Sequence, residues 1–466
     1  MRGGGMPGGG MMDGGMKRTV AFETLGCKLN QYETDSIATT LRRCGYGVIG
    51  LEPGADAYVL NSCTVTNKAD RKSRNTLYRA ERFAREGSGA PVIMTGCFVE
   101  SHPDFTRPPS KGHVTYLVDN AHKNTIPDLL EAHFRGETVD YHTLAPDVFG
   151  FATPGQLFHT RTNIKVQDGC DNFCTFCIIP RVRGRAVSRP LEDVLREAEE
   201  AVAGGSRELV LTGVNMSRYR EVTPVVPAAD FPDLVRAILD LPGDFRLRIS
   251  SLEPDGLDER FLELFDHPRM CPHLHLCLQS GSDRILLEMR RMYTRAAYRE
   301  LAEKLRRKDR TFNLTTDVIT GFPGETERDL EASLEAVGEH RFGHVHVFPF
   351  SPRSGTRAER IKGAVDQREK RRRSVLVEAA AVEEKRRYRA SLVGGYERVL
   401  VERVETTADG DGASVGIGLG EHYVPVRFTA PGRGGVIRTN TFYNVRITGL
   451  EADRADPRLI GLSEDL

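Results

Sequence analysis

Short apolar runs alternate with longer amphipathic segments along the first third of the chain. Segments with helical spacing lie around residues 35–43 and 70–85. The runs rich in β-branched and aromatic residues, which are the predicted strands, are 19–26, 57–62 and 91–96. Because strands separated by helices pair in parallel, the pattern predicts βα units and a parallel sheet over residues 19–150.

The alternation resumes beyond a polar stretch at 135–157, whose Gly and Pro content predicts a linker. The next predicted strands are 162–168, 207–213, 245–251, 273–279, 313–320 and 344–350. Six βα units in a row predict a partial (β/α)6 barrel of the TIM type over residues 157–390, with a basic helix at its end. Periodicity leaves a doubly wound sheet open as the alternative.

The two ends of the chain differ from its central part in their residue pattern. Short alternating strands with Gly-rich turns, at 397–404, 422–428 and 441–450, predict a small all-β barrel over residues 392–455. The first residues are mostly Gly and Met, which bury too little apolar surface to offset the entropy of ordering. We therefore expect a disordered tail over residues 1–18, in an otherwise α/β protein.

Composition and charge limit the number of domains, the binding partners and the cellular compartment that we expect. The 466 residues are 39% hydrophobic, which is enough for two or three domains. Because 65 basic residues balance 65 acidic ones, nucleic acid could be bound only through local basic patches. No secretory signal and no membrane-spanning run stand out, so we expect a cytoplasmic protein. In that compartment the nine cysteines are expected to be metal ligands, catalytic thiols or core residues.

Three cysteines are clustered directly after the predicted strand 162–168, at the end where parallel βα folds build their sites. They are Cys170, Cys174 and Cys177. A structural zinc site needs four ligands, and a 4Fe-4S cluster normally takes four cysteines, so three would leave one iron open to a small molecule. Phe173 and Phe176 lie between the ligands and would shield a cluster from water. Three unrelated buried cysteines explain such tight clustering poorly.

A second set of three cysteines is spread over the first domain. Cys27, Cys63 and Cys97 each follow the end of a predicted strand. Neighbouring parallel strand ends lie about 5 Å apart, so the three thiols would converge on one crevice and could hold another cluster with an open iron. Burial of each cysteine as a small hydrophobe at the end of a strand is an alternative that spacing leaves open.

The spacing in "CDNFCTFC" resembles the motif of the radical S-adenosylmethionine enzymes. The resemblance implies that S-adenosylmethionine chelates the open iron and is cleaved by one electron to a 5′-deoxyadenosyl radical. The segments "LTGVN", "SSLEP", "LQSGSD" and "TTDVITGFPGET" resemble that superfamily's cofactor pocket. The cofactor-binding residues that this implies are Phe176, Gly213, Asn215, Glu253, Gln279, Asp317 and Gly321.

The first domain as a whole resembles the amino-terminal domain of the methylthiotransferases, a branch of that superfamily. The resemblance implies an auxiliary 4Fe-4S cluster on Cys27, Cys63 and Cys97, and hence two clusters in the chain. It also implies that S-adenosylmethionine serves both as methyl donor and as radical source, with an electron donor whose identity is unknown. The carboxyl-terminal segment resembles a TRAM domain, a small barrel that binds RNA.

Basic residues on the predicted helix at 368–389 and on the small barrel are candidates for contact with phosphates. They are Arg371, Arg372, Arg373, Arg386, Arg387, Arg398 and Arg427.

The segment "TLGCKLNQYETD" is most similar to the branch acting on N6-threonylcarbamoyladenosine at position 37 of tRNA, whereas the isopentenyladenosine branch typically reads "YGCQMN". We therefore expect a monomer that methylthiolates carbon 2 of that tRNA nucleoside. The alternatives are isopentenyladenosine in tRNA, a ribosomal-protein aspartate, and a non-catalytic RNA-binding iron–sulfur redox sensor.

Overall fold

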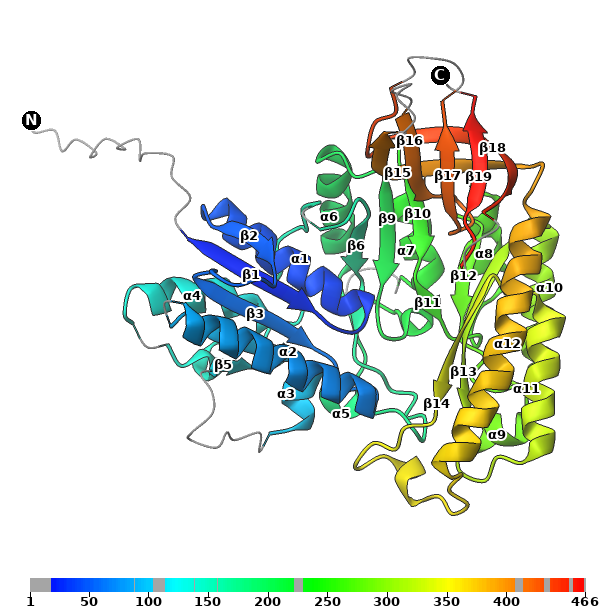
Figure 1. Ribbon diagram of the computed structural model, residues 1–466, viewed down its shortest axis with the longest axis horizontal. Coiled ribbons are helices and arrows are strands. Elements are labelled where there is room, and N and C mark those ends of the chain that lie inside the picture. Colours follow the sequence, from blue (N-terminus) through cyan, green and yellow to red (C-terminus); the bar gives the residue numbers. More distant parts are fainter. Residues whose placement is uncertain are drawn as a thin grey trace, which may run out of the picture.

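A computed structural model gives the arrangement of three domains (Figure 1). It describes residues 18–87, 89–103, 114–137, 139–156, 158–221, 229–406, 414–430, 436–451 and 456–464. All but the last residue of the expected disordered tail at 1–18 lie outside this part of the chain. No helix in the described part is long and apolar enough to cross a bilayer.

The first domain is a five-stranded parallel sheet in the order β2-β1-β3-β4-β5, as the sequence predicts. Its strands are β1 (Thr19–Thr24), β2 (Gly47–Gly50), β3 (Ala57–Ser62), β4 (Val92–Gly96) and β5 (Val114–Val118). Its helices are α1 (Lys28–Arg43), α2 (Asn67–Glu86), α3 (Cys97–Ser101) and α4 (Ile126–Phe134). Apolar side chains of α1 and α4 form one core with the sheet and those of α2 another, so helices cover both of its faces.

Helix α1 begins at Lys28, well before the predicted start at residue 35. Leu29 and Tyr32 continue the apolar spacing of Ile37 and Leu41 back to the end of β1, and all four side chains are buried. The earlier start places the first turn of α1 directly beside Cys27.

The central domain is an open barrel of parallel strands, which confirms the predicted partial barrel. One sheet has the order β10-β9-β6 and the other β11-β12-β13-β14, and a bridge between Leu247 and Met270 joins them. The strands are β6 (Thr162–Lys165), β9 (Glu208–Thr212), β10 (Arg246–Ile249), β11 (Ser251–Leu252), β12 (His273–Leu276), β13 (Asn313–Thr320) and β14 (His344–Pro349). A short antiparallel pair, β7 (Gln167–Asp168) and β8 (Val187–Ser188), lies beside it.

Helices cover the outside of this barrel (Figure 1). They are α6 (Leu191–Ala203), α7 (Phe231–Leu239), α8 (Glu259–Glu263), α9 (Asp283–Glu288), α10 (Arg295–Lys308), α11 (Glu327–His340) and α12 (Gln367–Ser391). Helix α5 (Ile179–Val182) instead follows the clustered cysteines and faces the first domain, where it contacts α3.

The third domain is a closed barrel in the order β15-β16-β17-β19-β18. Its strands are β15 (Tyr396–Thr406), β16 (Ser414–Leu419), β17 (Pro425–Thr429), β18 (Phe442–Leu450) and β19 (Leu459–Ser463). Strand β19 lies beyond residue 455, where the sequence predicted the domain to end. It closes the barrel by pairing with both β17 and β18, which a short segment near the chain end gives little sign of.

The first domain covers the open side of the central barrel. Helix α1 packs against β6, the free edge of one sheet, and Tyr32 donates a hydrogen bond to Glu197. Past β14, the free edge of the other sheet, Arg353 forms an ion pair with Asp70 (2.7 Å) and donates a hydrogen bond to Thr64 (2.8 Å). The contacts on both edges fix the ends of β1, β3 and β4 against the barrel.

The small β-barrel docks on the opposite end of the central barrel from the clustered cysteines. Arg246 and Arg248, in β10, form ion pairs with Glu208, the first residue of β9. Their guanidinium groups also donate to the backbone carbonyls of Leu419 (2.9 Å) and Glu421 (3.0 Å). The two arginines and Glu208 are buried, so the carbonyls supply partners for charges that would be costly to bury alone.

Candidate functional site

One loop carries Cys170, Cys174 and Cys177, named here the loop trio. A backbone frame shapes it, because the amide of Cys170 donates to the Gly184 carbonyl (3.1 Å) and the amide of Cys177 to the Cys174 carbonyl (3.0 Å). Gly169, before the loop, has φ +67°, and a Cβ there would lie 1.9 Å from the Arg185 carbonyl oxygen. The loop can therefore turn only with glycine at this position.

The thiols of the loop trio lie close enough to affect each other's charge. Burial raises the pKa of Cys177 to about 12, and charges on Cys174 and Cys170 contribute to this rise. All three side chains are half-buried, and none of the cysteines in the described residues is in a disulfide. Neutral thiols at rest suit a site in which a bound metal stabilises the thiolate form.

The other three cysteines, named here the strand trio, converge from three neighbouring strands. Cys27 follows β1, Cys63 follows β3 and Cys97 follows β4, and these strands are adjacent in the sheet. Burial raises the pKa of Cys63 to about 12, and charges on Cys97 and Cys27 act in the same direction. A Cβ at Gly26 would lie 3.0 Å from the Cys63 Sγ, so the turn before Cys27 passes directly over that thiol.

Each trio fits a 4Fe-4S cluster with one open iron. Both offer three thiols outside any disulfide, which is the donor set that such a cluster requires when a small molecule is to bind its fourth iron. Cys27 is exposed whereas Cys63 and Cys97 are buried, so the strand trio is open on one side.

The two trios border a common region. Cys97 packs against Ile178 and Val182, which directly follow the loop trio. A cavity of about 270 Å³ is lined by Val65 and Thr66, from the turn after Cys63, and by Phe176, from the loop trio. Gln279 and Asp317, at the carboxyl ends of the central strands, line the same cavity. A bound molecule there would touch both the first domain and the barrel.

The structure brings several predicted cofactor residues to this end of the barrel. The side-chain amide of Asn215 lies 4.0 Å from the Cys170 Sγ. Gln167 was not predicted, yet its Oε1 accepts hydrogen bonds from the amides of Val214 (3.0 Å) and Asn215 (2.8 Å). Gly213 lies against Gln167 and has no room for a side chain. Gln167 therefore holds the turn that carries Asn215.

Arg291 is a second buried residue at this end of the barrel that sequence reasoning missed. It forms an ion pair with Glu253, and its guanidinium carbon lies 5.5 Å from the centroid of the Phe176 ring. Burial raises the pKa of Cys174, and the Arg291 charge opposes that rise. Arg291 thus neutralises Glu253 and favours thiolate in the loop trio. Its position in the basic run "MRRMY" gave no sign of this role.

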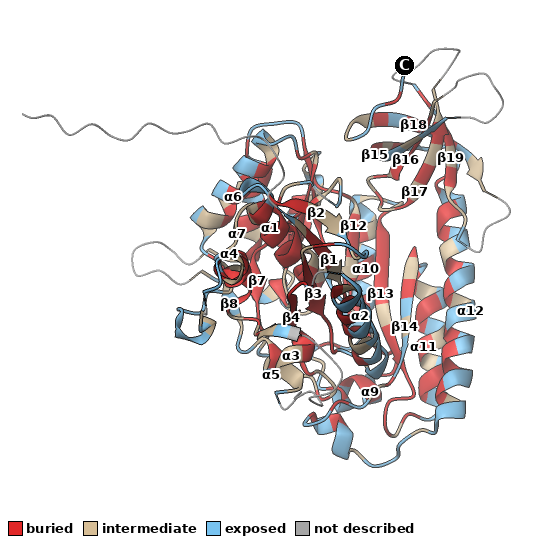
Figure 2. Ribbon diagram, turned by 60° about the vertical axis from the view of Figure 1, so that its left-hand side comes forward, coloured by how far each residue is buried: buried red, intermediate tan, exposed pale blue. Residues whose placement is uncertain are grey.

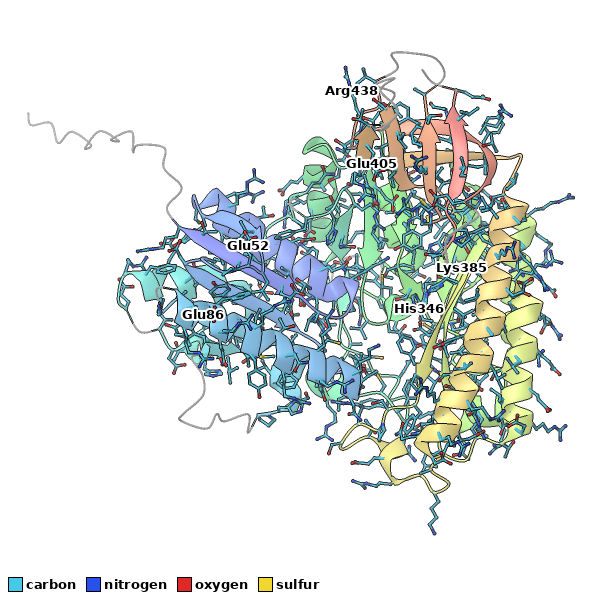
Figure 3. The ribbon with its side chains drawn as sticks, viewed as in Figure 1. Glu52, Glu86, His346, Lys385, Glu405 and Arg438 are labelled. Atoms are coloured by element: carbon cyan, nitrogen blue, oxygen red, sulfur yellow. The ribbon has the colours of Figure 1, made fainter. Side chains whose placement is uncertain are left out.

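Asp317 and Gly321 have different surroundings. Asp317 pairs with His275 (3.4 Å), and these two side chains and His346 have donor atoms within 4.8 Å of one another. Figure 3 shows His346 on β14. Asp317 and the two histidines therefore form a polar cluster on the neighbouring strands β12, β13 and β14. Gly321 has φ +69° and lies against Lys370, where a Cβ would come within 2.4 Å of the Lys370 Cγ, so it allows α12 to approach β13.

A buried group of charged side chains lies beside the strand trio. Its members are Glu33, Lys123, Lys165, Asp168 and Arg183, all almost fully buried. Arg183 bonds both Glu33 (3.0 Å) and Asp168 (2.9 Å). Three cations face two carboxylates, which leaves a surplus positive charge. Burial raises the pKa of Cys97, and the Arg183 and Lys123 charges oppose that rise.

The predicted RNA-binding arginines of α12 have unequal surroundings. Arg371 and Arg386 are exposed. Arg372 forms ion pairs with Glu327 and Glu369, and Arg387 pairs with Glu383 and Glu384. Arg373 is buried and bound to Glu325 (2.7 Å), so the structure gives it a packing role instead of a place on the surface. Figure 2 shows α12 with one exposed face.

The two arginines of the small barrel also differ. Arg398 lies over Phe442, 3.9 Å from the ring centroid, and forms an ion pair with Asp244 of the central domain (2.8 Å). It therefore helps to dock the barrel. Arg427, on β17, is half-buried.

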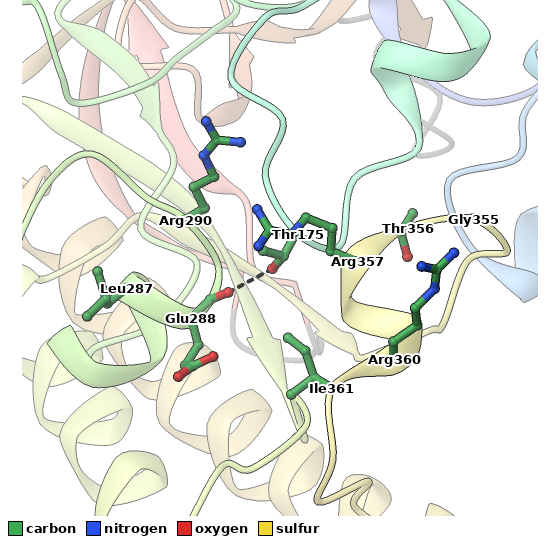
Figure 4. A pocket seen from close by; sticks show the side chains of 9 residues that line it. All are labelled: Thr175, Leu287, Glu288, Arg290, Gly355, Thr356, Arg357, Arg360 and Ile361. Atoms are coloured by element: carbon green, nitrogen blue, oxygen red, sulfur yellow. Dashed lines mark hydrogen bonds between the residues drawn. The ribbon is translucent and has the colours of Figure 1, made fainter.

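A basic hollow lies on the outer side of the loop trio (Figure 4). It has a volume of about 500 Å³ and its lining includes Thr175, Arg290, Arg357 and Arg360. The Thr175 hydroxyl donates to the Glu288 carbonyl (2.8 Å), which ties the cysteine loop to α9. The hollow thus presents positive charge next to the loop trio and away from the shared cavity.

Sequence comparison identifies the class first. Residues 164–337 match the radical SAM superfamily, and residues 19–112 match an uncharacterized protein family, UPF0004. The structure of the radical S-adenosylmethionine methyltransferase TsrM from Kitasatospora setae has a TM-score of 0.51 and 16% identity, over 72% of this chain and 75% of that one. This likeness shows that the two share a fold.

Whole-chain relatives then define the family. A threonylcarbamoyladenosine tRNA methylthiotransferase, MtaB, from Thermotoga maritima is 34% identical over 94% of this chain and 96% of its own. The Bacillus subtilis MtaB is 34% identical over 88% of this chain and 90% of its own. A tRNA-2-methylthio-N(6)-dimethylallyladenosine synthase from Geobacter sulfurreducens is 35% identical over 83% of this chain and 87% of its own. The chain belongs to the radical SAM methylthiotransferases, enzymes that use S-adenosylmethionine and two 4Fe-4S clusters.

Proposed function

We propose that this enzyme transfers a methylthio group to carbon 2 of N6-threonylcarbamoyladenosine at position 37 of tRNA. The observation that carries the proposal is a cavity between the segments that hold the two trios, whose lining includes Val65 and Thr66 from the turn after Cys63 and Phe176 from the loop between Cys174 and Cys177. The relatives named for threonylcarbamoyladenosine, which span nearly the whole chain, support this choice of substrate.

The two trios would have different roles in the reaction. When bound, a cluster on the loop trio supplies the electron that cleaves S-adenosylmethionine, and one on the strand trio carries the group to be transferred. Asn215 and Glu253 lie at the loop trio, where their polar atoms can hold the amino acid part of S-adenosylmethionine. Phe176 lines the cavity between the trios and would exclude water from it.

Exposed basic residues on α12 and on the small β-barrel would bind the RNA. Small β-barrels bind single-stranded nucleotides on an open face, and flanking cations contact the phosphates. Arg371 and Arg386 on α12 are exposed, and Arg427 lies on the barrel. We propose these three as phosphate contacts and assign Arg372 and Arg387 a weaker part, because carboxylates already pair with them.

The electron donor would approach from the outer side of the loop trio. The basic hollow formed by Arg290, Arg357 and Arg360 lies there and would favour an acidic protein surface. We further propose that the enzyme acts as a monomer in the cytoplasm, where tRNA is found and free thiols persist. Size-exclusion chromatography with light scattering tests the monomer.

Mass spectrometry of tRNA nucleosides from cells that lack the gene tests the proposed function. Selective loss of 2-methylthio-N6-threonylcarbamoyladenosine, restored by the gene, is the expected result. Loss of only the dimethylallyl analogue would instead assign the activity named for the Geobacter relative. Unchanged tRNA together with loss of a methylthio group from a ribosomal protein would overturn the RNA substrate altogether.

A further inference from the structure

Lys28 directly follows Cys27 of the strand trio and is the first residue of α1. Its ammonium nitrogen lies 5.3 Å from the centroid of the Tyr423 ring, which belongs to the small β-barrel. Within the described residues no carboxylate forms an ion pair with Lys28, and no side chain or backbone group forms a hydrogen bond with it. A lysine beside a cluster ligand therefore contacts the third domain without a charged partner.

Further basic side chains gather around the same tyrosine. Arg161 donates to the Tyr423 hydroxyl (3.4 Å), Arg248 lies 4.8 Å from the ring centroid, and the His273 ring is 4.6 Å away. These side chains come from the strand approaching β6, from β10 and from β12, while Lys28 comes from the first domain. All three domains thus meet at Tyr423.

The charges around Tyr423 do not balance. Arg161 pairs with Glu402 (3.2 Å), and Arg248 pairs with Glu208 (2.8 Å). Glu208 is shared with Arg246, and the Glu421 carboxylate also faces Arg246, so three carboxylates face four cations when Lys28 is included. A surplus of positive charge in a largely buried junction is costly unless an anion arrives with the ligand. Among these four cations, Lys28 is the one without an ion pair to a described carboxylate, so an anion that binds it displaces none.

We propose that Lys28 determines substrate specificity by binding the carboxylate of the threonylcarbamoyl group. This inference rests on the proposed function. The base must place carbon 2 at the strand trio, and the N6 substituent leaves the ring from the same edge as carbon 2. A side chain on the residue next to Cys27 is therefore well placed to meet the end of that substituent.

The same lysine would reject an apolar substituent. A dimethylallyl group offers no hydrogen-bond acceptor, so it would exclude water from the ammonium group of Lys28 and leave the charge unpaired. Sites built for a polar group discriminate strongly against analogues that lack it, because the buried partner is then unsatisfied. Lys28 would thus favour one tRNA nucleoside and disfavour the other.

The experiment uses holoenzyme with both clusters, assayed anaerobically on anticodon stem-loop RNA that carries threonylcarbamoyladenosine or its methyl ester. For wild-type enzyme we expect kcat/KM to fall on the order of 10- to 100-fold from the acid to the neutral ester, because a charge-assisted contact is lost. K28M should lower kcat/KM for the acid by a similar factor, mainly by raising KM. For the ester, whose kcat/KM is already low in the wild type, K28M should cause little further loss. K28R should restore most of the activity on the acid.

Two controls keep folding and substrate choice separate from this inference. Lys304 lies on α10 at the outside of the barrel and pairs with Glu259 (2.8 Å), so K304M removes a lysine charge without touching the junction and should leave kcat/KM unchanged. Iron content and 5′-deoxyadenosine formation report whether K28M keeps its clusters. If K28M loses its clusters, the comparison of wild-type enzyme with K28R, each assayed on the acid and on the ester, still tests the role of Lys28.

The outcomes separate the two levels of the proposal. Wild-type enzyme that ignores threonylcarbamoyladenosine and modifies dimethylallyladenosine RNA overturns the proposed function. Wild-type enzyme that modifies the acid and the ester equally well overturns the role of Lys28 alone. So does a K28M enzyme, intact by iron content, whose loss on the ester equals its loss on the acid.

Discussion

The two cysteine trios offer the same ligands but are assembled in different ways. Cys170, Cys174 and Cys177 lie in one loop, whose shape depends on nearby backbone bonds and on the turn at Gly169. The strand trio comes from the ends of β1, β3 and β4 and exists only when those strands are neighbours. A substitution far from the loop should therefore leave the loop trio in place, whereas the strand trio depends on the packing of the whole sheet.

The electrostatic settings of the trios differ as well. Beside the loop trio, Arg291 is matched by Glu253. Beside the strand trio, Arg183 belongs to a buried group with one more cation than carboxylate. The strand trio therefore has the greater buried positive charge next to it, whereas the basic hollow beside the loop trio is open to solvent, and we expect the strand trio to bind the more negatively charged group.

The largest effect should come from removing one ligand of each trio in turn. Cys174→Ala should abolish both 5′-deoxyadenosine formation and methylthiolation, because the radical step fails first. Cys63→Ala should leave 5′-deoxyadenosine formation measurable and stop methylthiolation. Iron analysis and product assays check both, and each variant should lose about half of the iron. Full product from Cys63→Ala would contradict the assignment of the strand trio.

A glycine substitution should impair the strand trio selectively. Gly26 has φ +107°, and a Cβ there would lie 2.9 Å from the Cys63 Cβ, so Gly26→Ala should displace Cys63. We expect loss of the auxiliary cluster, measured as iron per chain, with 5′-deoxyadenosine formation retained.

Gly54→Ala is the matched control for Gly26→Ala. Gly54 also has a positive φ, +90°, but no atom lies within 4 Å of the added Cβ. Iron content should therefore stay at the wild-type value. If both variants lose iron equally, backbone strain and not contact with Cys63 is the cause.

Two arginines of the same segment should differ in their effect on stability. Arg183→Met breaks a buried charge group and should lower the free energy of unfolding by about 3–5 kcal/mol. Arg185 pairs with Asp171 on the surface, so Arg185→Met should change the free energy of unfolding much less than Arg183→Met. Chemical denaturation under anaerobic conditions measures both. Equal losses would show that Arg183 contributes no more than a surface ion pair.

The smallest effect concerns the docking of the third domain. His422 bonds Glu397 (2.7 Å) and Asp309 (3.3 Å). Burial opposes its protonation, but these carboxylates raise the pKa of His422 to about 10. Because the folded-state pKa is raised, this stabilisation is complete below about pH 6.5, the ordinary pKa of histidine, and is lost as the pH rises through 10.

Thermal unfolding at pH 7 and pH 10 checks this pH dependence. The Tm of the wild type should fall from pH 7 to pH 10, because the two carboxylates then face a neutral ring. Other groups titrate in this range, so the comparison is with His422→Asn, whose Tm should fall less than that of the wild type between the two pH values. An identical fall in both proteins would contradict the role of His422.

Much of the fold followed from the pattern of apolar residues. The predicted strand 57–62 is β3 residue for residue, because it begins with an apolar run, and 313–320 is β13, because it is rich in β-branched residues. Strands β2 and β5 were not predicted, since both are short edge strands with weak patterns. Arg373 and Arg398 looked like surface cations, and only packing reveals the carboxylates that pair with them.

The sequence by itself determined the six cysteines, the order of the βα units and the texture of the small barrel. It could do so because ligand spacing and strand periodicity are local properties. Only the tertiary structure decided that the segments holding both trios line one cavity, that Arg183 lies beside the strand trio, and that Lys28 contacts Tyr423. These contacts join residues that are far apart in the chain, and they depend on which strand edges the first domain and the small barrel cover.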